Sequence, residues 1–323
     1  MSKKEQLHDT LGNRLKQYEA LSTSRQLMPN CPVYARIDGR AFHTFCRGLE
    51  KPFSKAFILV MQKTCKFLVK ETNACLGYVQ SDEISLGWEN IVKAPFDGRV
   101  QKLESSLASL ASARFIYTIL RGIVRGIENE YDLDTMLAKV DQNPPSFDCR
   151  VFNVPTMTEL ANCFLWREND AIKNSISGMS LNFYSHKELQ NKNSDEKIHM
   201  MRMKGHCFYE DTDPAFMRGT FYHRENYLKA LTDEEVARIP ENRRGGLITE
   251  GENSAKTMMR QGDGSWLELK PRTYYCWRSH IVPMNLPYRL TETSDLEKVL
   301  FSGIAPECKI ENPTFDLSKR EEV

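Results

Sequence analysis

The feature that most restricts the fold is a pair of apolar segments separated by three polar residues. The segments 76–80 (LGYVQ) and 84–88 (ISLGW) are typical of strands, and Ser81, Asp82 and Glu83 lie between them. A connection this short joins antiparallel strands, because parallel strands need a crossover of about a dozen residues or more. The sequence therefore predicts a β-hairpin with an acidic turn.

Other strands and amphipathic helices are predicted on both sides of this hairpin. Apolar residues that recur at every third or fourth position indicate helices, and short apolar runs bounded by turn residues indicate strands. Strands are predicted over 31–38, 146–154 and 216–224, and helices over 5–24, from Ser54 to about 68, over 101–127 and over 156–176, with shorter helices beginning at Ser185 and Ser194. After the first helix the order begins β-α-β-β-α-β, continues with helices and ends in a strand, which favours an α+β fold.

The chain length and a change of composition indicate two parts. A chain of 323 residues exceeds one minimal domain. Past Arg243 the sequence becomes rich in glycine, proline and aromatic residues. We therefore expect one domain over 1–243 and a turn-rich C-terminal extension of unassigned role over 244–323.

Composition excludes several classes of protein. Hydrophobic residues make up 41% and charged residues 27%, which is ordinary for a globular protein. The net charge is only +1, so the chain is not coated with positive charge. The apolar run 57–61 is far shorter than the roughly 20 residues that span a bilayer. With no secretory signal at the N-terminus, we expect a cytoplasmic protein without membrane contact.

The chemistry indicated by the sequence depends on acids at two turns. Asp38 ends an apolar strand and is followed by Gly39, and Asp82 and Glu83 lie in the hairpin turn. If the strands are neighbours, the carboxylates gather at one edge and repel one another unless a cation lies between them. Oxygen ligands suit Mg²⁺, and the Gly39 carbonyl has no Cβ beside it. The pattern fits a two-metal site for phosphoryl or nucleotidyl transfer, although acidic turns are also common without function.

Longer motifs around these acids resemble a known family. The two main ones are RIDGRAFHTFCRGLEKPFS (36–54) and YVQSDEISL (78–86). Shorter ones follow in order: GRVQKLESSLASLASARF (98–115), FDCRVFNVP (147–155), LWREND (165–170) and FMRGTF (216–221). Together they resemble the tRNA(His) guanylyltransferase superfamily of 3′–5′ RNA polymerases. The resemblance implies a polymerase-palm-like antiparallel sheet with helices on one face, and a nucleotidyltransferase domain over 1–243.

The resemblance also implies a role for the acids and for a lysine. Asp38 and Asp82 would ligate two Mg²⁺ ions, with the Gly39 carbonyl as a further ligand. Glu83 would support the same catalytic centre. Lys51 matches a position close to the 5′ phosphate of the RNA.

A second set of positions matches residues that bind nucleotides. The resemblance implies that His43 would lie near the activating nucleotide and that Ser81 would take part in activating the 5′ end. Arg36, Arg99 and Lys102 match basic residues that hold the incoming triphosphate. Arg99 and Lys102 are three residues apart at a helix start, so they share a face that favours phosphate.

One departure from the family pattern bears on specificity. Eukaryotic members carry H-I-N-N after their W-R-Q-x-D motif, whereas this chain has DAIKNSISG over 170–178. Arg167, Asp170 and Asn174 share one helical face, and we expect them to contact the tRNA end. The altered motif resembles the bacterial, archaeal and phage-type branch, which is associated with template-dependent repair of truncated tRNA 5′ ends.

The leading hypothesis is therefore an Mg²⁺-dependent 3′–5′ nucleotidyltransferase that acts on tRNA 5′ ends, with ATP and GTP or other NTPs as substrates. The alternatives are a dedicated tRNA(His) guanylyltransferase that adds G−1, and a palm-type nucleotide cyclase that needs no RNA. A non-catalytic RNA-binding protein would not need the acids and Lys51 together. The resemblance further implies a homotetramer.

Overall fold

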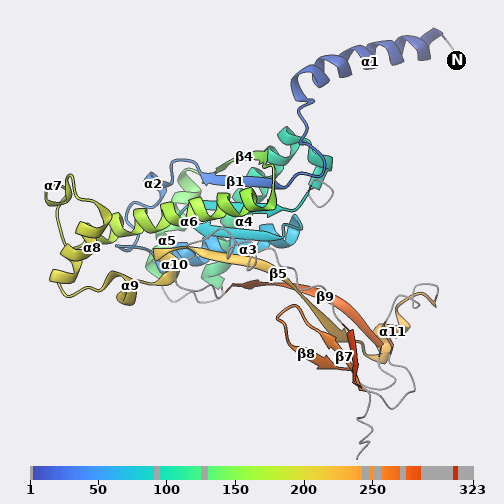
Figure 1. Cartoon of the computed structure of the whole chain (residues 1–323). Coiled ribbons are helices and arrows are strands. Elements are labelled where there is room, and N and C mark those ends of the chain that lie inside the picture. The colour runs from blue at the N-terminus through green and yellow to red at the C-terminus, as the bar shows by residue number, and fades with distance from the viewer. Residues whose placement is uncertain are drawn as a thin grey trace, which may run out of the picture. The chain divides into compact units, whose positions relative to one another are not determined.

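The computed structural model describes residues 3–90, 95–124, 130–241, 248–249, 256–269, 274–284 and 308–311 (Figure 1). The chain divides into two compact units, one built on Met1–His223 and the other on Arg224–Val282. The boundary predicted after residue 243 lies within the second of these units.

The first unit is organised around an antiparallel sheet. Its described strands follow the order β4-β1-β3-β2-β5, and they are β1 (Val33–Gly39), β2 (Leu76–Gln80), β3 (Glu83–Trp88), β4 (Phe147–Asn153) and the start of β5 (Thr220–Ala230). The hairpin of β2 and β3 is present as predicted, with Gln80 opposite Glu83. Glu83 is thus the first residue of β3, and Ser81 and Asp82 alone make the turn.

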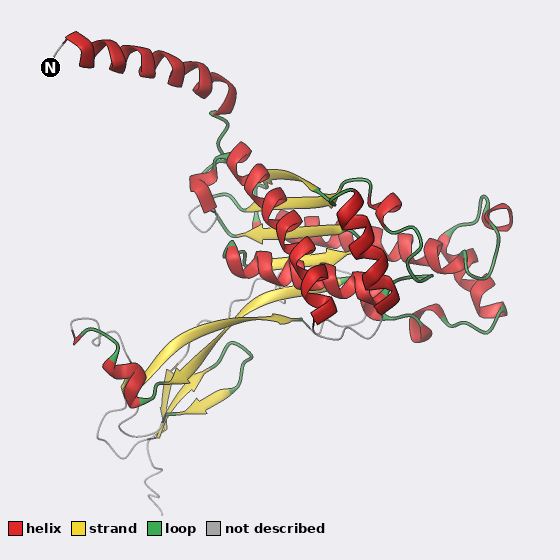
Figure 2. Ribbon diagram, turned by 180° about the vertical axis from the view of Figure 1, so that it is seen from behind, coloured by secondary structure: helices red, strands yellow, loops and turns green. Residues whose placement is uncertain are grey.

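Helices cover both faces of this sheet. They are α3 (Lys55–Glu71) and α4 (Val100–Val124) on one face and α6 (Met157–Ser180) on the other (Figures 1 and 2). A Cβ added at Gly77 would lie 2.2 Å from Val69 of α3, and one added at Gly87 would lie 3.0 Å from Phe164 of α6. Because β3 is buried along its whole length, both of its faces need a cover. The α+β class with an antiparallel sheet is confirmed, and α6 covers a face that the sequence left without a helix.

Helix α5 (Glu130–Gln142) was not expected from the sequence. It packs against α4 and α3 and buries Leu133 and Met136. Between β1 and α3 lies another unexpected element, the single helical turn α2 (Phe42–Phe45). Its Phe42 packs against Phe115 and Phe147, which fixes α2 at the end of β1.

Helix starts agree with the predicted capping residues. Ser54 accepts a hydrogen bond from the Phe57 amide at the start of α3, and Thr156 caps α6. Ser185 forms a capping box, whereas the next short helix is capped by Asn193. The remaining helices of the first unit are α1 (Lys3–Thr23), η1 (Pro95–Gly98), α7 (His186–Leu189), α8 (Ser194–Met203), α9 (Phe208–Asp211) and α10 (Pro214–Met217). No helix in the described ranges is both long and apolar enough to cross a bilayer.

The second unit is a small β structure. It contains the second half of β5, followed in strand order by β9 (Tyr274–Pro283) and β6 (Ile248–Thr249), and a separate sheet of β10 (Cys308–Glu311), β7 (Lys256–Arg260) and β8 (Trp266–Glu268). Helix α11 (Asp233–Ala237) also belongs to it. Leu228, Met259, Leu269 and Tyr275 form its apolar cluster. The predicted site residues all lie in the first unit.

Candidate active site

The pairing of β1 with β3 brings the predicted acids together. Asp38 lies directly opposite Glu83 in the register of the two strands, and the Gly39 amide donates a hydrogen bond to the Asp82 carbonyl at 3.0 Å. The turn is closed by Ser81, which has a positive φ of 47°. Asp38, Gly39, Asp82 and Glu83 therefore form one acidic edge of the sheet.

The position of Gly39 has a steric reason that is independent of any ion. A Cβ at this position would lie 2.4 Å from the ring of Phe42. That distance is shorter than real Cβ contacts, so a side chain here would displace Phe42 from its aromatic cluster. The glycine keeps the acidic edge close to α2.

Electrostatics at the acidic edge suit a cation. Burial raises the pKa of the Asp82 carboxyl, the charge of Asp38 raises it further, and the Ser81 hydroxyl opposes the rise. Within the described ranges no group of three or more His, Cys, Asp or Glu side chains is arranged to hold a metal ion by itself. A divalent ion here would therefore take further ligands from the Gly39 carbonyl, substrate phosphates and water, as Mg²⁺ commonly does. The donor set at this edge fits Mg²⁺.

Glu83 differs from the two aspartates because an arginine neutralises it. Arg167 of α6 donates to both of its carboxylate oxygens, from Nε at 2.6 Å and from Nη2 at 2.8 Å. Both residues are buried, with 7% of Arg167 and 5% of Glu83 exposed. Burial raises the pKa of Glu83, and Arg167 opposes that rise. Arg167, predicted from the sequence to contact tRNA, thus lies inside the protein against the acidic edge.

Two further predicted residues contact this ion pair, and a third lies on the same helix. The Arg36 guanidinium lies 3.9 Å from Glu83, and Asp170 lies 3.2 Å from Arg167 on the more exposed side of α6. Asn174, one turn further along, is exposed and lines a cavity. The predicted helical face is therefore present, and it runs from the buried ion pair to the surface.

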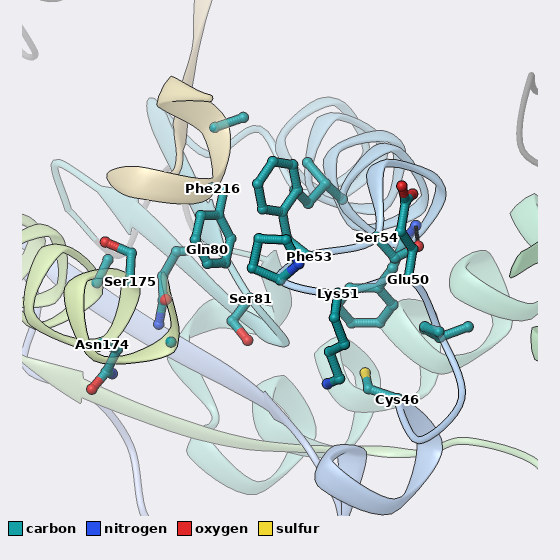
Figure 3. A pocket seen from close by; sticks show the side chains of 17 residues that line it. Cys46, Glu50, Lys51, Phe53, Ser54, Gln80, Ser81, Asn174, Ser175 and Phe216 are labelled. Carbon is teal, nitrogen blue, oxygen red and sulfur yellow. Dashed lines mark hydrogen bonds between the residues drawn. The ribbon is translucent and has the colours of Figure 1, made fainter. Parts of the chain in front are cut away.

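Figure 3 shows a cavity of about 240 Å³ whose lining includes Ser81, the residue next to Asp82 of the acidic edge. Lys51 and Ser81, the two residues predicted to act at the 5′ end, both line it. Figure 3 shows Lys51 on one side of the cavity and Asn174 on the other. Its apolar wall includes Phe53 and Phe216, whose rings stack at 4.4 Å and 22°. The cavity thus combines a flat aromatic wall with a cation, which suits a nucleotide.

Phe53 and Phe216 were not predicted as site residues. They are 163 positions apart in the sequence, so no local spacing connects them. The sequence signals are that Phe53 follows the Lys51-Pro52 pair and that both residues lie in the motifs at 36–54 and 216–221.

Arg99 and Lys102 lie at the start of α4, on the side where β1 begins. The Gly98 carbonyl accepts from the Leu27 amide, and Met28 bonds to Asn153 at the end of β4. Asn153 pairs with Val33, the first residue of β1, which lies five positions before Asp38. At about 3.3 Å per residue, Val33 and Asp38 are roughly 17 Å apart along the strand. His43, in contrast, is close enough to lower the pKa of Asp82.

Comparisons with known proteins identify the family of this chain. The family model described as tRNAHis guanylyltransferase matches residues 12–155. The tRNA(His) guanylyltransferase of Schizosaccharomyces pombe is 26% identical over 224 residues, which is 65% of this chain and 79% of the yeast protein.

Two solved structures are also similar. A bacterial tRNA(His) guanylyltransferase-like protein in complex with ATP is 32% identical with a TM-score of 0.55, and the match covers 66% of this chain and 88% of that one. Another such bacterial protein, in complex with GTP, is 23% identical with a TM-score of 0.57, covers 90% and 99% of the two chains, and shows the shared fold. With its acidic edge and these similarities, the chain belongs to the tRNA(His) guanylyltransferase family of nucleotidyltransferases.

Proposed function

We propose that this protein is an Mg²⁺-dependent 3′–5′ nucleotidyltransferase that repairs tRNA 5′ ends by template-dependent addition. The observation that carries the proposal is that two aspartates, Asp38 and Asp82, lie at one sheet edge beside the cavity lined by Lys51 and Ser81. That edge can hold cations, and the cavity can hold the nucleotide whose phosphates those cations neutralise. A palm-type cyclase would share the acids but would not require RNA.

The reaction has two steps that share this edge. A 5′-phosphate oxygen of the RNA attacks the α-phosphorus of ATP, and pyrophosphate leaves. The 3′-hydroxyl of the incoming NTP then attacks the adenylylated 5′ phosphate, and AMP leaves. When bound, Mg²⁺ neutralises phosphate charge and lowers the pKa of the attacking hydroxyl. Asp38, Asp82 and the Gly39 carbonyl would hold these ions.

ATP is assigned to the cavity as the activating nucleotide. The stacked Phe53 and Phe216 offer an apolar wall for a base, and Lys51 would bind phosphate oxygens. His43, which is close to Asp82, would bind phosphate from the side of the acidic edge. The similar bacterial proteins solved with ATP and with GTP support nucleotides as substrates. Arg36, beside Glu83, would meet the incoming triphosphate.

Recognition of tRNA is assigned to the exposed end of the α6 face. Asp170 and Asn174 lie there, whereas Arg167 would act from inside by holding Glu83. Arg99 and Lys102 remain assigned to phosphate binding; their distance from the acidic edge of their own chain suits a longer ligand or the neighbouring subunit of the expected homotetramer. Without H-I-N-N, the RNA itself supplies the sequence information by base pairing, and the protein binds shape and phosphates.

Alanine at Lys51 or His43 is expected to impair the activation step selectively. Addition to 5′-monophosphorylated RNA should fall by at least about tenfold, since a hydrogen bond to a charged group contributes roughly 1.5–3 kcal/mol. Addition to 5′-triphosphorylated RNA, which needs no ATP step, should fall much less. Single-turnover rates on the two RNAs measure the difference, and equal losses on both would contradict the assignment.

Template-dependent repair is tested with tRNA acceptor stems that lack their first 5′ nucleotide. The stems carry each of the four bases at the opposing position, and each labelled NTP is supplied in turn. We expect the Watson–Crick partner to be added in every case and no addition without RNA. Insertion of G regardless of template, and only on tRNA(His), would instead show a dedicated guanylyltransferase. NTP turnover without RNA would show a cyclase.

A further inference from the structure

The segment between α2 and α3, residues 46–54, carries Lys51 and forms one side of the cavity. It contains no helix or strand hydrogen-bonding ladder of its own. Seven of its residues line the cavity: Cys46, Leu49, Glu50, Lys51, Pro52, Phe53 and Ser54. A segment of this kind holds a side chain in place only if other parts of the fold fix its backbone.

Lys139 of α5 fixes the start of this segment. Its ammonium group donates hydrogen bonds to the carbonyls of Phe45 at 2.6 Å and Thr44 at 3.4 Å, and to the carbonyl of Arg47. A helix end leaves carbonyls without partners inside the helix, and a lysine ammonium has three donors to offer. Lys139 thus directs its three donors at carbonyls at the end of α2 and just beyond it.

Asp132 of α5 fixes the other end. Its Oδ1 accepts from the Glu50 amide at 3.0 Å, and its Oδ2 accepts from the Ser54 hydroxyl. Ser54 in turn caps α3 by accepting from the Phe57 amide at 3.1 Å. Asp132 is fully buried, with 0% exposed. A buried carboxylate without such donors would be strongly disfavoured, so this geometry ties Glu50 and Ser54 to α5.

The two residues lie on one side of the same helix. Asp132 and Lys139 are seven positions apart, which is about two helical turns. Lys139 contacts the backbone over residues 44–47, and Asp132 contacts Glu50 and Ser54, so the two residues hold the chain on both sides of Gly48 and Leu49. Neither residue lines the cavity, so neither is placed to contact a ligand there.

We propose that α5 is a positioning element for nucleotide activation, in which Asp132 and Lys139 hold residues 44–54 so that Lys51 stays at the cavity. The inference rests on the proposed function, because it takes ATP as the cavity's ligand. It assigns to α5 a role that its packing against α3 and α4 does not require. Asp132 and Lys139 are positioning residues and do not touch the substrate.

The test compares Lys139→Met, which keeps the aliphatic stem but removes the donors, with Lys139→Arg, which restores a cation. Lys66→Met, an exposed lysine of α3, is the matched control. For Lys139→Met the KM for ATP on 5′-monophosphorylated RNA should rise by about tenfold, while kcat and addition to 5′-triphosphorylated RNA stay near wild type. Lys139→Arg should recover part of the loss, and Lys66→Met should show none.

Asp132→Asn provides a second variant that keeps the shape of the side chain, with exposed Asp134→Asn as its control. We expect Asp132→Asn to raise the KM for ATP, as Lys139→Met does. Calorimetric titration of each folded variant with ATP alone gives the same comparison without RNA. An unchanged ATP affinity in both α5 variants would overturn the proposal, as would equal losses on both RNAs with a lower melting temperature. If the wild-type protein binds ATP but adds no nucleotide, the proposed function is wrong. The ATP affinities of the α5 variants would still test whether α5 positions the cavity's residues.

Discussion

Replacing Asp38 or Asp82 with alanine is expected to lower nucleotide addition by about 10³-fold or more. Each substitution removes an oxygen ligand from the acidic edge, where bound ions would contribute several kcal/mol of transition-state stabilisation at about 1.4 kcal/mol per tenfold in rate. The loss should appear on both 5′-monophosphorylated and 5′-triphosphorylated RNA, because the two steps share the edge. Single-turnover rates across a Mg²⁺ titration measure it.

Stability separates loss of ligands from loss of fold in this experiment. The two carboxylates repel each other, and burial disfavours the charge on Asp82, so neutral replacements should leave the melting temperature unchanged or raise it. Asp134→Ala, which removes an exposed acid of α5, should change neither rate nor stability. A variant of Asp38 or Asp82 that keeps a near wild-type rate would show that this edge does not hold the catalytic ions.

Much of the fold follows from local signals in the sequence. The hairpin was predictable because two strand-like runs are separated by a turn too short for any other connection, and Ser54 and Thr156 cap helices where capping residues were expected. Helix α5 was missed because its contacts to residues 44–54 join positions more than 75 apart in the chain. That α6 covers the second face of the sheet was not predicted. All residues of β3 are buried, so the strand has no alternation of buried and exposed side chains that would assign one face to solvent.

The site was predictable to the extent that it depends on strand register. Asp38 and Asp82 meet because each lies at the end of a strand and the strands are neighbours in the sheet. Both strand ends were predictable from the turn residues that follow the apolar runs. The partner of Glu83 was not predictable, because Arg167 lies 84 positions away on a helix whose packing direction no local pattern gives. The same holds for the stacking of Phe53 on Phe216.

The second large effect is expected from Arg167→Ala, which should destabilise the first unit by about 3–5 kcal/mol, the usual cost of leaving a buried charge without its partner. For a unit of this size that corresponds to a fall in melting temperature of roughly 6–20 °C. Arg36, at 3.9 Å from Glu83, is too distant to replace the two lost hydrogen bonds. Thermal unfolding followed by circular dichroism measures the loss.

The pH dependence identifies Glu83 as the source of that loss. Burial already raises the pKa of Glu83, and removing Arg167 raises it further. For an acid whose pKa is higher in the folded state, stability falls as the pH rises from its unfolded pKa, near 4.3, through its folded pKa. Arg167→Ala should therefore be least destabilised at about pH 5 and most destabilised at pH 8.

A compensating change completes the argument. Glu83→Gln combined with Arg167→Met removes both charges, and exchanging a buried ion pair for uncharged side chains of similar size is often neutral for stability. The double variant should regain most of the stability lost in Arg167→Ala, while Asp170→Asn, on the exposed side of the same arginine, should cost less than about 1 kcal/mol. A pH-independent loss that the double variant does not relieve would show that Arg167 acts through packing alone. If the double variant folds but adds nucleotides slowly on both RNAs, the ion pair holds the acidic edge in its active geometry as well as stabilising the fold.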